Sequence, residues 1–186
     1  SAASDVYKRQ SQGKSKKKKV IDQIKIGCSS TKTIYGERLD TVLIELNPEA
    51  KISGLFTSNK FKSAPVQICL KQLKKKMKGK KMLAINAGNA NAATGKKGVS
   101  DAKKLIREIS SLTDISTTQI LPFSTGVVGQ LLDVKSLSAA FSKCFTNLNK
   151  NSWEDFAKAI MTTDTKSKIV KPVSYTHLTL PTIRLG

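Results

Sequence analysis

Histidine is almost absent from this chain, because its 186 residues include a single one, His177. A Ser-His-Asp or Cys-His mechanism needs a histidine beside its nucleophile, and zinc sites are commonly built from histidine and cysteine. The three cysteines, Cys28, Cys69 and Cys144, are too widely spaced for a zinc site or a disulfide framework. We therefore expect no bound metal or cofactor, chemistry without a histidine base, and cysteines that serve only as buried packing residues.

Aromatic residues and arginine are also scarce, although the chain is strongly basic. Aromatics make up 5% of the residues, and the formal net charge of +20 comes almost entirely from lysine. Nucleic-acid recognition favours arginine forks and stacking aromatics, so this lysine excess is weak support for such a partner. A lysine-rich nucleic-acid-binding module stays open as an alternative, but we expect neither nucleic acid nor a membrane as partner. No apolar run approaches the roughly 18 residues of a membrane span, and we expect a cytoplasmic protein.

The two ends of the chain differ in character from the sequence between them. Ala2 to Gln10 can be encoded by GCAGCGTCAGATGTGTATAAGAGACAG, and the reverse complement of that string encodes Val173 to Leu180 in another frame. Two ends encoded by opposite strands of one short DNA indicate a translated sequencing adapter, which is excluded from reasoning about the fold. We therefore interpret residues 1–10 and 173–186, including His177, as an adapter artefact. Residues 11–19 are expected to be a disordered lysine-rich leader.

The remaining residues, 20–172, predict one mixed domain of strands and helices, an α/β (α+β) fold. Short β-branched runs predict strands at 20–26, 40–46, 52–57, 81–85 and 119–123, the second and third forming a hairpin. Apolar residues at helical spacing predict helices at 66–77, 99–112, 133–148 and 152–161, the last opening with Ser152 and Asp155 at capping-box spacing. Trp153 is expected to pack in the core.

Polar motifs stand at three predicted strand-to-loop junctions and near residue 160. They read FTSNKFKSAPVQIC from Phe56 to Cys69, INAGNANAATG from Ile85 to Gly95, QILPFSTGVVG from Gln119 to Gly129, and AIMTTDT from Ala159 to Thr165. Each has an ordinary structural explanation when taken alone, because Gly and Asn suit tight turns and hydroxyls satisfy free backbone amides.

Taken together and in this order, the four motifs resemble the glutamate/ornithine N-acetyltransferase family of arginine biosynthesis, the ArgJ family. The resemblance covers essentially all of residues 20–172 and identifies them as the N-terminal, α-chain part of such a protein. It implies an incomplete layered α-β-β-α domain of the ArgJ/DmpA type. It also implies a transferase that moves an acetyl group from N-acetylornithine to glutamate. In the bifunctional (multifunctional) members of the family, acetyl-CoA would be a co-substrate.

The resemblance further implies a role for particular residues. Family members cleave themselves autocatalytically at an Ala-Thr bond, and the new N-terminal threonine is the nucleophile, with its own amino group as base. Thr125, through its hydroxyl, and Gly126, through its backbone N–H, would form the oxyanion hole. Thr163, and next Thr162, would contact the substrate. Asn86 to Asn91 would be scaffold for the same cleft.

The family's nucleophile lies a few dozen residues beyond the TTDT motif, whereas we interpret the native sequence as ending near Pro172. We therefore expect the fragment to be inactive by itself and poorly soluble without its partner. That partner would be the C-terminal β chain of the same precursor, in a heterotetramer of two α and two β chains. A related self-processing amidohydrolase or aminopeptidase is a third alternative, against which the NAGNAN and AIMTTDT motifs argue. Whether the parent is monofunctional or bifunctional stays open.

Overall fold

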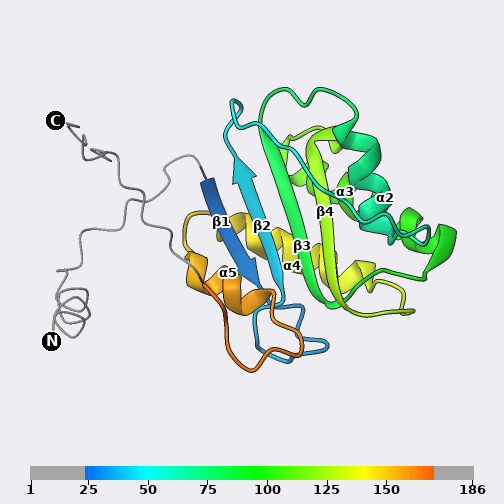
Figure 1. The fold of residues 1–186 in the computed structure, drawn as a ribbon. Helices are drawn as coiled ribbons and strands as arrows, with labels where there is room; N and C mark the ends of the chain where they lie inside the picture. The colour runs from blue at the N-terminus through cyan, green and yellow to red at the C-terminus, as the bar shows by residue number, and fades with distance from the viewer. Residues whose placement is uncertain (1–23, 170–186) are drawn as a thin grey trace, which may run out of the picture.

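A mixed four-stranded sheet forms the centre of the chain in the computed structural model, which describes residues 24–169 (Figure 1). The strand order is β1-β2-β3-β4. Strand β1, Ile24–Ser29, pairs antiparallel with β2, Thr41–Leu46. Strand β3, Lys81–Asn89, pairs antiparallel with β2 and parallel with β4, Ile120–Val127. The α/β fold class expected from the sequence is thereby confirmed.

Strand β2 shows why these residues form a sheet rather than a helix. Its sequence TVLIEL is a continuous apolar and β-branched run, and five of its six residues are buried. Such a run suits a strand with a neighbour on each edge and with packing on both faces. The one carboxylate in it, Glu45, is 9% exposed and forms ion pairs with Lys25 at 2.8 Å and Lys80 at 3.5 Å.

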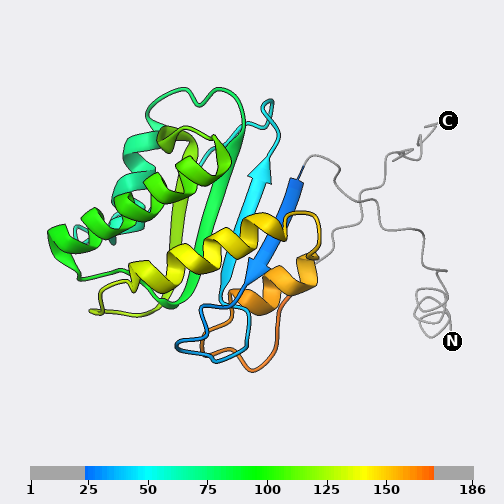
Figure 2. The same cartoon turned by 180° about the vertical axis from the view of Figure 1, so that it is seen from behind.

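Helices α3 and α4 lie against one face of the sheet (Figure 2). Helix α3, Gly95–Thr113, makes the long connection that parallel strands require between β3 and β4. Helix α4, Val134–Thr146, packs beside α3 and also contacts β1 and β2. Helix α2, Ala64–Leu73, lies along β4 and α3. A short 3-10 helix, η1, Thr117–Gln119, leads into β4.

Two apolar clusters hold these layers together, one on each face of the sheet. The larger cluster joins α2, α3 and α4 to the sheet, with Leu43, Met82 and Ile120 all at 0% exposure. The smaller cluster lies on the opposite face and joins β1 and β2 to α5, Trp153–Ala159. Ser152 and Asp155 form the expected capping box at the start of α5.

The face of β3 and β4 opposite α3 and α4 carries no helix within residues 24–169 (Figure 1). This face carries Leu83, Ile85 and Phe123. Leu83 and Ile85 pack with the smaller cluster, and Phe123 is the ladder partner of Ile85, so its side chain points to the same side of the sheet. Phe123 is 41% exposed. The connection from β2 to α2 crosses this face as an irregular segment in the view of Figure 1. An apolar sheet face is therefore left partly open.

The expected hairpin between residues 40–46 and 52–57 is wrong. Residues 51–59 form no regular secondary structure, and Leu55 within them is fully exposed. Strand β2 already has β1 on one edge and β3 on the other, so no edge is free for a further strand. The expected strands at 81–85 and 119–123 also end too early, because β3 continues to Asn89 and β4 to Val127.

The expected adapter segments, 1–10 and 173–186, and the expected leader, 11–19, lie outside the described residues. Within the described residues, no helix combines the length and the hydropathy that a membrane crossing would need.

Candidate functional site

Two glycines bring the ends of β3 and β4 into unusually close contact. Gly88 and Gly126 are partners in the parallel ladder, with φ angles of +103° and +126°. A Cβ atom on Gly126 would lie 2.3 Å from the carbonyl carbon of Gly88 and 2.7 Å from the backbone nitrogen of Asn89. A larger residue at position 126 would have both an unfavourable backbone conformation and no room. The preceding residue, Thr125, is therefore held at a fixed place near the end of β4.

Side-chain amides of the Asn-rich motif tie the same end of the sheet together. The Ser124 hydroxyl donates to Oδ1 of Asn86 at 2.6 Å, and Nδ2 of Asn86 donates to the backbone carbonyl of Asn89 at 2.9 Å. Nδ2 of Asn89 donates to the carbonyls of Gln130 and Leu131, each at 3.0 Å. Buried amides paired in this way rigidify the strand ends. The NAGNAN motif thus lies directly against the STG motif.

Thr125 lies on the sheet face that no described helix covers. It pairs with Ala87 in the ladder, and strand alternation places it on the same face as Phe123. Thr125 and Gly126 are both partly exposed. A hydroxyl and a close-approaching backbone at an accessible strand end are groups that can receive a ligand oxygen.

The segment with Thr162 and Thr163 follows α5 and is joined to the connection between β1 and β2. Nη2 of Arg38 donates a hydrogen bond to the carbonyl of Met161 at 2.7 Å. The guanidinium carbon of Arg38 lies 3.7 Å from the centre of the Tyr35 ring. Thr162 is half-buried and Thr163 is exposed. Both hydroxyls therefore belong to a surface segment whose backbone is anchored at Met161.

The β1–β2 connection also packs against the glycine pair. A Cβ atom on Gly88 would lie 2.9 Å from Cδ1 of Ile34 and 3.1 Å from Cε2 of Tyr35. In Figure 1 this connection (blue) and the segment after α5 (orange) lie together at the end of the sheet where β3 and β4 finish. The structure thus brings the four site residues expected from the sequence, Thr125, Gly126, Thr162 and Thr163, to one end of the sheet.

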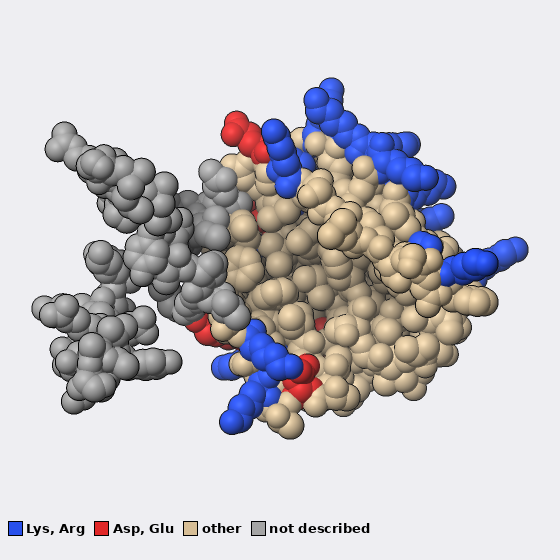
Figure 3. All heavy atoms as spheres, viewed as in Figure 1, with Lys and Arg blue, Asp and Glu red and all other residues tan. Residues whose placement is uncertain are grey.

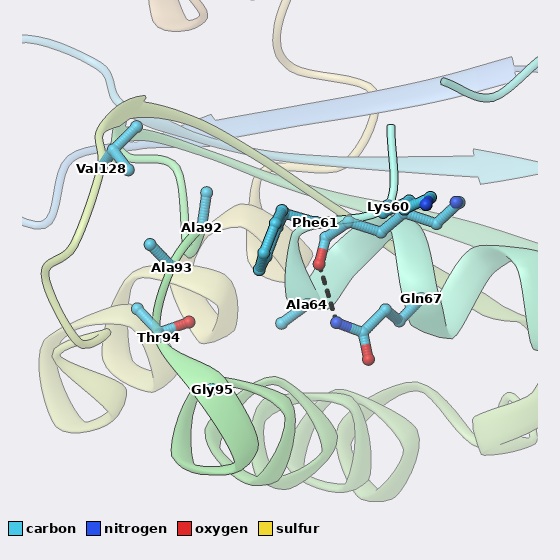
Figure 4. A pocket seen from close by; sticks show the side chains of 10 residues that line it. Lys60, Phe61, Ala64, Gln67, Ala92, Ala93, Thr94, Gly95 and Val128 are labelled. Atoms are coloured by element: carbon cyan, nitrogen blue, oxygen red, sulfur yellow. Dashed lines mark hydrogen bonds between the residues drawn. The ribbon is translucent and has the colours of Figure 1, made fainter. Parts of the chain in front are cut away.

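A cavity of about 440 Å³ opens beside this region (Figure 4). The FTSNKFKSAPVQIC and NAGNANAATG motifs supply most of its wall, and Val128, two residues after Gly126, completes it. The Lys60 side chain extends away from Ala92 and Ala93 in Figure 4, so the wall near the strand ends is mainly apolar. The Phe61 ring at its rim is 94% exposed.

The open sheet face has few charged side chains at its centre, and lysine and arginine side chains stand around its edge (Figure 3). Figure 3 also shows this face as hollowed rather than convex. An uncharged, partly apolar centre with a charged rim is the pattern of a surface that another polypeptide covers.

The three cysteines are buried, as expected. Burial raises the pKa of the Cys69 thiol to about 11. Burial, with a smaller contribution from the Asp155 carboxylate, raises the pKa of Cys28 to about 12. Burial likewise raises the pKa of Cys144. Thiols that hold their protons are poor nucleophiles.

The described part of the chain holds no group of three or more His, Cys, Asp or Glu side chains that could bind a metal ion. The expected core position of Trp153 is wrong, because this residue is 41% exposed. It occupies the first turn of α5 and packs edge-on against Phe156, with ring centroids 5.8 Å apart.

Sequence reasoning missed the residues that connect the motifs. Arg38 and Tyr35 belong to none of the four motifs, and Arg38 contacts a carbonyl 123 positions along the chain. The one feature of the sequence that could have drawn attention to Arg38 is the scarcity of arginine, since the chain has only four arginines.

Comparison with known proteins assigns the same motifs to one family. The family model described as "ArgJ family" matches residues 24–183. The chain is 36% identical over 148 residues to the arginine biosynthesis bifunctional protein ArgJ of Methylococcus capsulatus, covering 80% of this chain and 36% of that protein. It is 37% identical over 157 residues to the protein of the same name from Colwellia psychrerythraea, covering 80% and 37%. The chain thus spans little more than a third of the length of these relatives.

Two solved structures share the fold. Ornithine acetyltransferase from Mycobacterium tuberculosis, solved in complex with ornithine, superposes with a TM-score of 0.71 at 24% identity, over 77% of this chain and 78% of that one. The arginine biosynthesis bifunctional protein ArgJ of Bacillus halodurans superposes with a TM-score of 0.65 at 25% identity, over 77% and 74%.

Proposed function

The chain belongs to the ArgJ family, and from this premise we propose that it is the N-terminal part of an acetyltransferase of arginine biosynthesis. The reaction would transfer an acetyl group from N-acetylornithine to glutamate in the cytoplasm. The observation that carries the proposal is the close contact of Gly88 and Gly126 beside Thr125, at the end of the sheet that also holds Thr162 and Thr163. Curated relatives named as bifunctional ArgJ proteins support the same activity.

Thr125 and Gly126 would stabilise the oxyanion of this reaction. Attack on an acetyl carbonyl converts its oxygen into an alkoxide, which is stabilised by donors fixed in place before the charge develops. The Thr125 hydroxyl and the Gly126 backbone N–H are the proposed donors. The ladder contact at Gly88 and the hydrogen bond from Ser124 to Asn86 restrain this part of β4. Such restraint lowers the reorganisation that the transition state would otherwise require.

Thr163 and Thr162 would bind the amino-acid substrate through their hydroxyls. Thr163 is exposed and Thr162 half-buried, so both can reach a ligand on the surface of the α chain. Backbone anchoring at Met161 keeps this segment near the β1–β2 connection.

The nucleophile would be a threonine supplied by the part of the relatives' length that this chain does not match. Self-cleavage before that threonine would release its amino group as the base. The lengths of the relatives fit a cleaved precursor. This chain covers more than 70% of each solved chain but less than 40% of each curated protein. The solved chains are therefore much shorter than the curated proteins, as chains produced by cleavage would be. The chain by itself would then have no transferase activity. Acetyl-CoA would be a second acetyl donor if the parent is bifunctional.

The C-terminal β chain of the same precursor would cover the open face of β3 and β4. That face presents Phe123 and Thr125 among few charges, with lysines around its rim. A β chain docked there would bring its N-terminal threonine to the strand end at which Thr125 and Gly126 lie. Two such αβ units would form the heterotetramer.

Acetyl transfer by the full-length polypeptide that contains this chain tests the proposal. With N-acetylornithine labelled in the acetyl group, we expect labelled N-acetylglutamate to appear. Thr125→Ala is expected to lower kcat by about 10²- to 10³-fold with little change in KM, because the lost donor acts only on the developing charge. Thr125→Ser keeps the hydroxyl and is expected to recover most of the loss. Absence of transfer by the unsubstituted protein would contradict the proposal.

A further inference from the structure

We propose that Arg38 is a positioning residue, which holds the Thr162–Thr163 segment close to the end of β4. Substrate bound by these threonines would then lie next to the oxyanion donors at Thr125 and Gly126. The inference rests on the proposed function, since it assigns Arg38 a part in that same site. Arg38 itself would touch neither the substrate nor the reacting atoms.

The first observation is that Arg38 anchors an otherwise weakly attached segment. Its Nη2 donates to the Met161 carbonyl at 2.7 Å. The other hydrogen bonds of residues 161–169 within the described chain are local, from Met161 to Lys158 and from Lys168 to Asp164. One charged donor therefore fixes the backbone immediately before Thr162.

The second observation is a continuous path of contacts from Arg38 to the glycine pair. The guanidinium lies 3.7 Å from the Tyr35 ring centre, and Tyr35 with Ile34 packs so closely on Gly88 that no Cβ would fit there without a shift. Gly88 in turn touches the backbone of Gly126. Arg38 therefore links the Thr162–Thr163 segment to a loop that already packs against the end of β3 and β4.

The third observation concerns the choice of arginine at this position. A guanidinium can stack on an aromatic ring and donate in its own plane at the same time, whereas a lysine ammonium is a single point charge. Nε of Arg38 is buried and has no hydrogen-bond partner among the described residues. Leaving a buried N–H of a charged group unpaired destabilises the fold. An arginine at position 38 can therefore hold the Met161 carbonyl and the Tyr35 ring at the same time, although its Nε stays unpaired.

Loss of the Arg38 anchor should weaken substrate binding more than it slows the chemical step. If the Thr162–Thr163 segment becomes mobile, its contacts weaken equally in the ground state and the transition state, which raises KM and leaves kcat nearly unchanged. We expect Arg38→Met to raise the KM for N-acetylornithine about tenfold, the effect of losing about 1.4 kcal/mol of binding. This pattern is the reverse of that expected for Thr125→Ala.

The test compares Arg38→Met, Arg38→Lys and Glu37→Gln in the full-length polypeptide. Glu37 is the matched control, because it adjoins Arg38 and its exposed side chain pairs, among the described residues, with Lys32 on the surface. A raised KM in Arg38→Met, partial recovery in Arg38→Lys and no change in Glu37→Gln are the expected results. An unchanged KM in Arg38→Met, in an active wild-type background, overturns the inference.

A second measurement separates this inference from the proposed function. Amide hydrogen exchange of the present chain reports the order at Met161, whose N–H donates to the Lys158 carbonyl at 3.3 Å, without any need for activity. We expect faster exchange there in Arg38→Met than in the wild type or in Glu37→Gln, with exchange in α3 unchanged. Equal exchange rates in all three proteins overturn the inference even if acetyl transfer is observed. Should the full-length wild type show no transfer, the proposed function fails, and the exchange rates alone decide whether Arg38 holds the segment.

Discussion

Substitution of Gly126 by alanine probes the contact on which the candidate site is built. Two costs add in this variant. Alanine at a φ of +126° carries backbone strain of about 1–3 kcal/mol. Its Cβ would lie 2.3 Å from the carbonyl carbon of Gly88, so the strands must move apart, at a further cost of about 1–3 kcal/mol. We therefore expect Gly126→Ala to lower the free energy of unfolding by about 2–6 kcal/mol.

Gly129 provides a matched control, because it isolates the backbone strain from the steric contact. Its φ is +85°, yet nothing lies within 4 Å of the place that a Cβ would take. Gly129→Ala is therefore expected to cost only the strain, about 1–3 kcal/mol. Urea unfolding of both variants, followed by circular dichroism, measures the difference, provided that the slope m is unchanged. Equal destabilisation by the two substitutions would refute the close approach of β3 and β4.

Three further substitutions test other parts of the structure. Ser152→Ala removes the capping box of α5 and should lower the free energy of unfolding by about 1 kcal/mol. The control is Ser167→Ala, which changes an exposed serine and should leave the free energy of unfolding unchanged. The pKa of Cys69 is raised from 9.0 to about 11, so the unfolded thiol ionises first and stability should fall as the pH rises from 9.0 towards 11. Cys69→Ala should flatten that part of the pH–stability profile, and an unchanged slope would count against burial of the thiol. Phe61 is 94% exposed, so Phe61→Ser should reduce self-association in sedimentation while changing the free energy of unfolding by less than about 0.5 kcal/mol.

Elements whose burial pattern is strong could be predicted from the sequence. The apolar face of α3 repeats at helical spacing, and Ala102, Leu105, Ile106 and Ile109 are all buried there. The start of α5 could also be predicted, because the capping box at Ser152 depends only on local residues. In these cases the local preference and the tertiary packing agree.

The sequence failed where tertiary pairing overrode local preference. Residues 52–57 look like a strand, but β2 has no free edge to pair with them. The Asn and Gly residues that end β3 suggest a loop, yet the ladder with β4 keeps Ala87 to Asn89 in the sheet. Strand propensity depends on neighbours that a single sequence does not show.

The motifs of the candidate site could be recognised in the sequence, whereas the contacts that join them could not be predicted. The STG motif points to Thr125 and Gly126 as candidates, and the structure places them in one ladder with Ala87 and Gly88. The link from Arg38 to Met161 joins residues 123 positions apart and leaves no periodic signal. Contacts of this kind follow from the packing of the whole domain.

Sequencing the source DNA beyond the codon for Pro172 decides whether this chain is the N-terminal part of a longer, self-processing acetyltransferase. We expect an open frame that continues through a Gly-rich stretch to an Ala-Thr pair, followed by a second chain of family length. A native stop codon that arrives before any such threonine would contradict it.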